Sequence, residues 1–170
     1  MFLFRFHSPH AAILIALLLV AGCGTVELKV VLDQQYSAQP GTKVVLGSVK
    51  NQTGQSFDID VEKMLADALG QALKERNLQG TGGSAPKLML AVDIVEYAKG
   101  DAFKRWLVPG WGSTVLVVRG ALYESDSRKV GSVDAKRTVD AGGIYTRDAW
   151  ETVFRKLADD IVSKLAEQVK

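Results

Sequence analysis

The sequence predicts a two-layer α/β sandwich, in which two amphipathic helices cover one face of a mixed, mostly antiparallel sheet of four to five strands. Segments with the apolar alternation of β-strands surround one segment with apolar residues at helical spacing, and a second helical segment ends the chain. Each helical segment has a single apolar stripe, which favours two helices packed on the same sheet face. A short polar connector between the last two strands makes that pair antiparallel.

The first 22 residues have the composition of an export signal. Arg5 precedes an apolar run at residues 11–21, which is shorter than the roughly 20 residues that a membrane-spanning helix needs. Two small residues then stand directly before Cys23, the only cysteine, and this arrangement resembles the lipobox of bacterial lipoproteins. We expect cleavage of residues 1–22 and a covalent acyl lipid on Cys23. The alternative is an ordinary secretory signal with a chance cysteine at its end.

The mature chain lacks the side chains that most catalytic and metal sites require. Both histidines, His7 and His10, lie in the signal, and the lipid would consume the thiol of Cys23. This excludes Ser-His-Asp and Cys-His catalysis and metal sites built on imidazole or thiolate. Loss of Arg5 leaves 20 of the 21 basic residues against 19 acidic ones, so no basic nucleic-acid surface is expected. The acyl lipid is the only cofactor-like group that we expect.

A hydrolase built on paired carboxylates is the enzyme class that remains open. The acidic residues best placed on strands, Asp93 and Glu96, are three positions apart and are expected on opposite sheet faces. They would not form an adjacent pair. We therefore predict that the protein is not an enzyme and keep a carboxylate-dependent hydrolase as the less favoured alternative.

The mature chain divides into an N-terminal segment, residues 23–41, and a single α/β domain, residues 42–170. Apolar residues alternate from Val26 to Leu32, which is typical of an edge strand or of an extended tether between lipid and domain, and the sequence favours neither. The β-branched residues of segment 43–50 predict the next strand.

A helix separates the next two strands and allows them to run in parallel. Apolar residues from Val61 to Leu73 recur at helical spacing, and Ser56 or Asp58 is the expected N-cap. Residues 87–97 are apolar on both faces and predict a central strand. A helical crossover can connect this strand in parallel to the one before it.

The C-terminal part of the chain predicts a β-hairpin followed by the second helix. Strands are expected at residues 114–124 and 129–140, joined by the polar connector at residues 125–128. Thr146 is the expected N-cap of the last helix, whose apolar stripe runs from Trp150 to Leu165.

Several segments together resemble the bacterial lipoprotein family known as domain of unknown function 4410. They are segment 43–49 with 51–54, segment 92–97, Arg105 with 109–113, and segment 145–165. Arg105 with the Gly-Trp-Gly motif is the most specific of these. More distantly, the element order is similar to that of curli-secretion lipoproteins, the N-terminal domain of TolB and lipoprotein activators of peptidoglycan synthases. The resemblance implies binding and assembly roles and supplies no catalytic residues.

The stretch at residues 102–113, between two predicted strands, contains the candidate contact surface at residues 104–113, because a hairpin needs only two to five residues at this point. Tryptophan and arginine are enriched where interfaces concentrate binding energy, and glycine allows close approach of a partner. The candidate partner-binding residues are Lys104, Arg105, Trp106, Pro109, Gly110, Trp111 and Gly112. Three interpretations stay open: a local minicore in which the tryptophans fold back over the sheet edge, a protein-contact surface, and shallow contact with the membrane.

These observations predict an acylated envelope lipoprotein that acts as a non-catalytic binding or assembly module in the periplasm. Gly24 follows the cysteine where aspartate would signal retention in the inner membrane, so in a Gram-negative cell we expect the outer membrane. The expected partner is an envelope protein or a second copy of the chain. The alternative function is activation or regulation of a periplasmic synthase.

Replacement of the predicted lipid attachment site tests the anchor. Cys23→Ala should leave an unprocessed precursor, because cleavage of a lipoprotein signal follows attachment of lipid to the thiol. The wild-type chain should stay in the membrane fraction, since several acyl chains at about 0.8 kcal/mol per buried CH₂ give a strong anchor. Intact mass and membrane fractionation measure both. Recovery of Cys23→Ala as a correctly cleaved, unlipidated protein would contradict the prediction.

Overall fold

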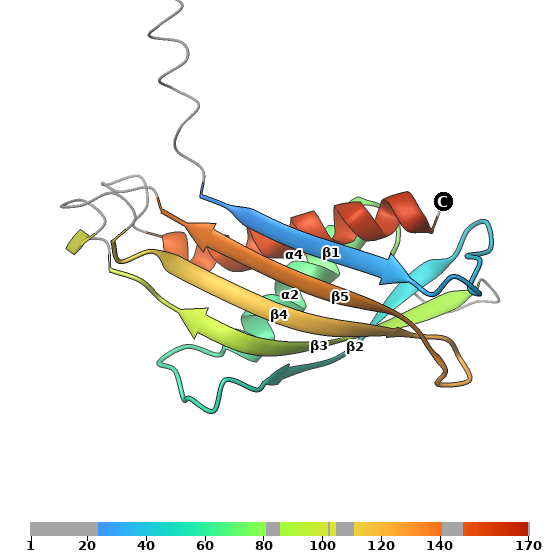
Figure 1. Cartoon of the computed structure of the whole chain (residues 1–170), viewed down its shortest axis with the longest axis horizontal. Helices are drawn as coiled ribbons and strands as arrows, with labels where there is room; N and C mark the ends of the chain where they lie inside the picture. The colour runs from blue at the N-terminus through green and yellow to red at the C-terminus, as the bar shows by residue number, and fades with distance from the viewer. Residues whose placement is uncertain (1–23, 81–85, 102, 105–110, 141–147, 170) are drawn as a thin grey trace, which may run out of the picture.

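The computed structural model describes residues 24–80, 86–101, 103–104, 111–140 and 148–169. A five-stranded sheet forms one layer, and two helices form the second layer on one of its faces (Figure 1). The elements in chain order are β1 (Val26–Leu32), β2 (Lys43–Asn51), α2 (Val61–Glu75), β3 (Lys87–Ala98), β4 (Thr114–Tyr123), β5 (Lys129–Val139) and α4 (Ala149–Gln168). The predicted fold class is confirmed.

The sheet has the strand order β1-β5-β4-β3-β2, with β1 and β2 at its edges. The strands β2 and β3 run parallel, because helix α2 connects them, and the other neighbouring strands run antiparallel. The segment from Val26 to Leu32, which the sequence left open between edge strand and tether, is the edge strand β1. It extends the sheet that the chain from residue 42 onward builds.

The hydrophobic core lies between the sheet and the two helices. Helix α2 buries Leu65, Leu69 and Leu73, and helix α4 buries residues such as Leu157 and Ile161. These residues follow the helical spacing from which the two helices were predicted. Both apolar stripes therefore face one common core beneath the sheet.

The caps of the two helices differ from the sequence-based expectation. The N-cap of α2 is Asp60, whose carboxylate accepts a hydrogen bond from the backbone N–H of Lys63 at 2.9 Å, so the prediction of Ser56 or Asp58 was wrong. Asp58 instead accepts a hydrogen bond from Lys99 Nζ at 2.6 Å, which lowers the pKa of its carboxyl group. Helix α4 follows Asp148, whose side chain makes no capping hydrogen bond, and the expected cap at residue 146 lies outside the described residues.

An irregularity in β3 changes the predicted placement of two carboxylates. The register shifts between Ile94 and Glu96, so that Val95 is an extra residue in the strand. The alternation of faces is thereby reset, and Asp93 and Glu96 both lie exposed on the face away from the helices, while Tyr97 turns into the core. The prediction of opposite faces was wrong because strict alternation does not continue through a bulge.

Tyr97 is a buried titratable group at the end of β3. Its ring lies against Phe57 and Phe154, its residue is only 5% exposed, and its hydroxyl group has no hydrogen-bond partner among the described residues. Burial, with the negative charge of Asp58 as the smaller cause, raises the pKa of Tyr97 to about 12. The unfolded chain ionises near pH 10, so the stability contributed by neutral Tyr97 is present below pH 10 and is lost as the pH rises towards 12.

Tyr97→Phe should therefore make the fold more resistant to alkali. At pH 7 the variant should be as stable as the wild type or more stable by up to about 1 kcal/mol, because it removes an unsatisfied buried hydroxyl group. At pH 11 its advantage should increase. Urea unfolding at the two pH values measures both, with Tyr123→Phe as a matched control away from the core. Equal alkaline loss of stability in the wild type and Tyr97→Phe would refute the assignment.

Candidate functional site

One end of the sheet collects the segments that the sequence singled out. Thr25 and Thr138 exchange two backbone hydrogen bonds, with N–O distances of 3.1 and 2.9 Å. Thr138 is paired with Val115, and Val115 with Ala98, so these four residues form one row across β1, β5, β4 and β3. We call this the Thr25 end of the sheet. The chain enters the fold here, and the connection from β3 to β4 and the connection from β5 to α4 leave from the same end (Figure 1).

The backbone is held tightly from Gly24 onward. Gly24 has a φ of +65°, and a Cβ at this position would lie 1.8 Å from the carbonyl oxygen of Thr138. Only glycine fits this approach. The sequence analysis interpreted Gly24 as a sorting residue alone and missed this packing role. The fold thus begins one residue after Cys23, which itself lies outside the described residues.

The described part of the β3–β4 connection is closed at its base by hydrogen bonds. The hydroxyl group of Thr114 donates to the carbonyl of Lys99 at 2.8 Å, and the backbone N–H of Asp101 donates to the carbonyl of Gly112 at 2.8 Å. The carboxylate of Asp101 accepts from the backbone N–H groups of Phe103 and Lys104 at 2.9 and 3.1 Å. Asp101 therefore holds the turn that carries these two side chains.

Gly112 is the point at which the two sides of this connection come closest. Its φ is +74°, and a Cβ would lie 2.7 Å from Cβ of Lys104 and 2.8 Å from the carbonyl oxygen of Asp101. Both the backbone conformation and the space therefore require glycine. This assigns Gly112, one of the predicted site residues, a role in shaping the connection.

The structure places three of the seven predicted partner-binding residues. Lys104, Trp111 and Gly112 lie together at the Thr25 end, and Trp111 is 58% exposed, which favours a contact surface over the minicore of Trp106 and Trp111. Phe103, which the sequence analysis did not select, is also exposed, at 66%. An aromatic residue inside a turn gives no periodic signal in the sequence. The other predicted residues, Arg105, Trp106, Pro109 and Gly110, lie outside the described part of the chain.

Two lysines of the described chain at this end form ion pairs near the surface. Lys104 Nζ is 3.9 Å from Asp101, while Lys99 Nζ pairs with Asp58 and lies 5.4 Å from the ring centre of Trp150. Exposed pairs of this kind contribute little to stability, because water and salt screen the charges. These two pairs therefore give the described part of this end no strong preference for one sign of ligand charge.

The sheet face opposite the helices bears a ladder of exposed charges. One residue from each strand contributes, and their signs alternate across the sheet in the order Lys50, Asp93, Arg119, Asp134, Lys29. Arg119 Nε lies 3.9 Å from a carboxylate oxygen of Asp134. Opposite charges on neighbouring strands stabilise the pairing modestly and keep the face solvated.

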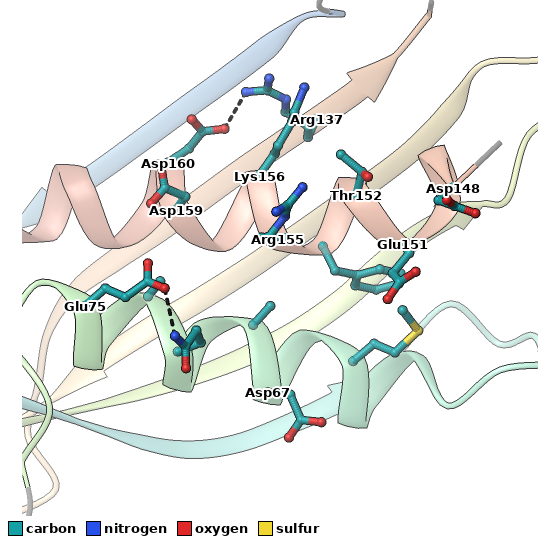
Figure 2. Close-up of a pocket in the computed structure, with 15 residues that line it drawn as sticks. Asp67, Glu75, Arg137, Asp148, Glu151, Thr152, Arg155, Lys156, Asp159 and Asp160 are labelled. Atoms are coloured by element: carbon teal, nitrogen blue, oxygen red, sulfur yellow. Dashed lines mark hydrogen bonds and ion pairs between the residues drawn. The ribbon is translucent and has the colours of Figure 1, made fainter. Parts of the chain in front are cut away.

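A hollow of about 960 Å³ lies on the other side of the molecule, over helices α2 and α4 (Figure 2). Its lining combines apolar side chains such as Met64 and Phe154 with a charged rim. On the rim, Arg137 pairs with Asp160 at 2.6 Å, and Gln71 donates to Glu75 at 2.8 Å. None of the lining carboxylates is buried, so the hollow lacks the desolvated acid pair that a hydrolase would use.

Two further features bear on binding at this protein. No group of three or more acidic, histidine or cysteine side chains within the described ranges is arranged to hold a metal ion. No helix in that part of the chain is long and apolar enough to cross a membrane.

Comparisons with known proteins identify a family and a fold. A family model described as Domain of unknown function (DUF4410) matches residues 49–143, more than half of the chain. Two crystal structures of PelC from Paraburkholderia phytofirmans, both described as dodecamers, have similar folds. One of them is 16% identical to this chain, with a TM-score of 0.60. The other, a single-residue variant of PelC, is 18% identical, with a TM-score of 0.57. Each match covers 86% of this chain and 99% of the PelC chain. No curated protein matches the sequence significantly.

Two substitutions distinguish how much the backbone shape at Gly112 and the exposed ring of Trp111 each contribute to stability. Gly112→Ala should lower the free energy of unfolding by about 1–3 kcal/mol, because alanine is strained at this φ and meets Asp101 and Lys104. Trp111→Ala should change it by less than about 0.5 kcal/mol, because the ring is mostly exposed. Urea unfolding measures both values. If Trp111→Ala destabilises the fold as much as Gly112→Ala does, the minicore interpretation is correct.

Proposed function

Because this chain belongs to the family described as Domain of unknown function (DUF4410), we propose that it is a lipid-anchored envelope protein whose non-catalytic task is assembly with further copies of itself. The observation that carries the proposal is the edge strand β1. It begins three residues after the predicted lipidation site at Cys23 and presents unpaired backbone groups to its surroundings. An edge strand of this kind is a template for adding another strand.

The hydrogen-bond pattern of β1 shows which groups are available. Thr25 directs its N–H and C=O groups to Thr138, so the next residue, Val26, directs its own away from β5. By the same alternation, the backbone N–H and C=O groups of Leu28 and Val30 also point away from β5, in the plane of the sheet. Among the described residues, only the outward carbonyl of Val30 has a partner, the side-chain amide of Gln168 at 2.8 Å. The stretch from Val26 to Leu28 thus remains open to another chain.

Self-association has further support from the fold comparison. The two PelC structures are dodecamers, and this chain has a similar fold over most of its length. The two edges of the present sheet, β1 and β2, run antiparallel to each other. Residues 78–80 of the same chain occupy the outward groups of Val44, and Glu62 accepts from the N–H of Asn51, so only the part of the β2 edge between Val44 and Asn51 is available. A β1 edge could add antiparallel to this part in a neighbouring copy while all copies keep the same orientation. Repeated contacts between two different edges can close into rings.

Substitution at Val26 tests both self-association and the edge. Val26→Pro should reduce the mass of the acylated protein to that of a monomer, because proline removes an outward N–H without touching the hydrogen bonds to β5. Val26→Thr is the matched control, since it keeps the N–H and a β-branched side chain. Analytical ultracentrifugation in detergent measures the mass. A monomeric wild type would overturn self-association, whereas an oligomeric Val26→Pro protein would exclude the β1 edge as its interface.

A further inference from the structure

We propose that the Thr25 end of the domain lies directly on the lipid surface that holds Cys23, with the ring of Trp111 in the interface between headgroups and acyl chains. This inference rests on the proposed lipid anchor. It concerns the end of the sheet and not the backbone edge of β1, which adjoins it at Val26, and the two proposals can fail independently. Four observations support it, and they come from chain length, strand register, side-chain exposure and charge.

The length of free chain leaves the domain almost no distance from the membrane. Consecutive Cα atoms are about 3.8 Å apart, so Cys23 lies within about 8 Å of Thr25, whose backbone is fixed in the sheet. The headgroup layer on each side of a bilayer is itself roughly 5–8 Å thick. Acyl chains on Cys23 would therefore bring the first folded residues into or against the headgroup layer.

The strand register brings the β3–β4 connection to the same level. Thr25 and Ala98 stand in one row, three strands apart, and this corresponds to about 14 Å across the sheet. The connection with Trp111 continues beyond Ala98 and Val115, in the direction in which the chain continues from Thr25 to Cys23. A surface that binds the acyl chains would thus lie across the end of the sheet and meet the connection.

Exposed apolar side chains are concentrated at this end. The large hydrophobic residues with the most exposure in the described structure are Phe103 at 66%, Trp111 at 58% and Val26 at 47%. All three belong to the Thr25 end, whereas the next two, Val31 and Met89, are less exposed and lie elsewhere on the sheet. Aromatic rings favour the membrane interface, where an apolar body and a polar edge are both accommodated.

The nearby charges are compatible with a lipid surface. Lys104 is more than half exposed, and a lysine beside interfacial aromatic rings can reach the phosphate groups of lipids. The closest carboxylate, that of Asp101, is occupied with two backbone N–H groups of the turn. A protein partner at this end would have to fit between the domain and the bilayer. Little room is left there, because Gly24 follows Cys23 directly in the sequence.

Depth-dependent quenching of tryptophan fluorescence provides the test. The acylated full chain with Trp106→Phe and Trp150→Phe retains Trp111 alone and is placed in vesicles of phosphatidylethanolamine and phosphatidylglycerol, with or without brominated acyl chains. The matched control lacks all three native tryptophans and has Tyr123→Trp. This position is nine residues from Thr114 along β4, about 30 Å away from the Thr25 end. Circular dichroism checks that both variants are folded.

We expect brominated lipids to quench Trp111 several-fold more than the tryptophan at position 123. Equal, weak quenching of the two would overturn the proposal, and so would undiminished access of Trp111 to the water-soluble quencher acrylamide. If either variant fails to fold, the same quenching is compared between the wild type and Trp111→Ala, whose quenched share of the emission should fall. Mass spectrometry of the vesicle-bound protein reports the lipid on Cys23 separately. An acylated protein with unquenched Trp111 would leave the anchor intact and overturn only the docking, whereas a protein without the lipid would overturn both.

Discussion

The backbone pairing of Thr25 with Thr138 is the constraint on which the arrangement of this protein depends. It joins the first folded residue to the end of β5, and Gly24 makes the approach possible because a side chain would collide with the Thr138 carbonyl. The pairing makes β1 an edge strand and leaves no spacer between the fold and Cys23. The β3–β4 connection reaches the same end of the sheet by register alone. One pair of hydrogen bonds thereby determines which surface lies nearest to the point where the lipid would be attached.

The two faces of the sheet have different physical roles. Helices α2 and α4 cover one face and account for the apolar core, while the other face stays open and bears the alternating ladder centred on Arg119. The signs of the charges in the ladder follow the same order from either edge of the sheet. Two copies packed face to face about a twofold axis through Arg119 would set like charges against like, which costs several kcal/mol. Symmetric pairing of the open faces is thus opposed, and the strand edges are the better route to assembly.

The sequence predicted the fold well where regular periodicity determines it. The stripes from Val61 to Leu73 and from Trp150 to Leu165 gave both helices, and the polar connector at 125–128 gave the antiparallel hairpin. It failed where one local contact decides between alternatives. Asp60 caps α2 because its carboxylate reaches Lys63, and the bulge at Val95 moves Glu96 to the face of Asp93; neither depends on a repeating pattern. Of the site, the sequence identified Trp111 and Gly112 from composition, but not their exposure and close packing, which depend on the distant segments that surround them.

The exposure of the carboxylates bears on the proposed non-catalytic function. Burial next to a charged partner is what tunes an acid or base for catalysis, and Asp93 and Glu96 are exposed instead. Among the described residues, the buried ones are mostly apolar, with Tyr97, Thr42 and Thr114 as polar exceptions, while every charged side chain is at least partly exposed. Such a surface suits the recognition roles that we propose: backbone groups at the β1 edge can pair with another strand, and aromatic rings at the Thr25 end can enter a lipid interface. These two surfaces meet at Val26. Copies anchored through Cys23 would therefore hold their sheets at the same distance from the membrane, so that β1 of one copy could meet β2 of the next.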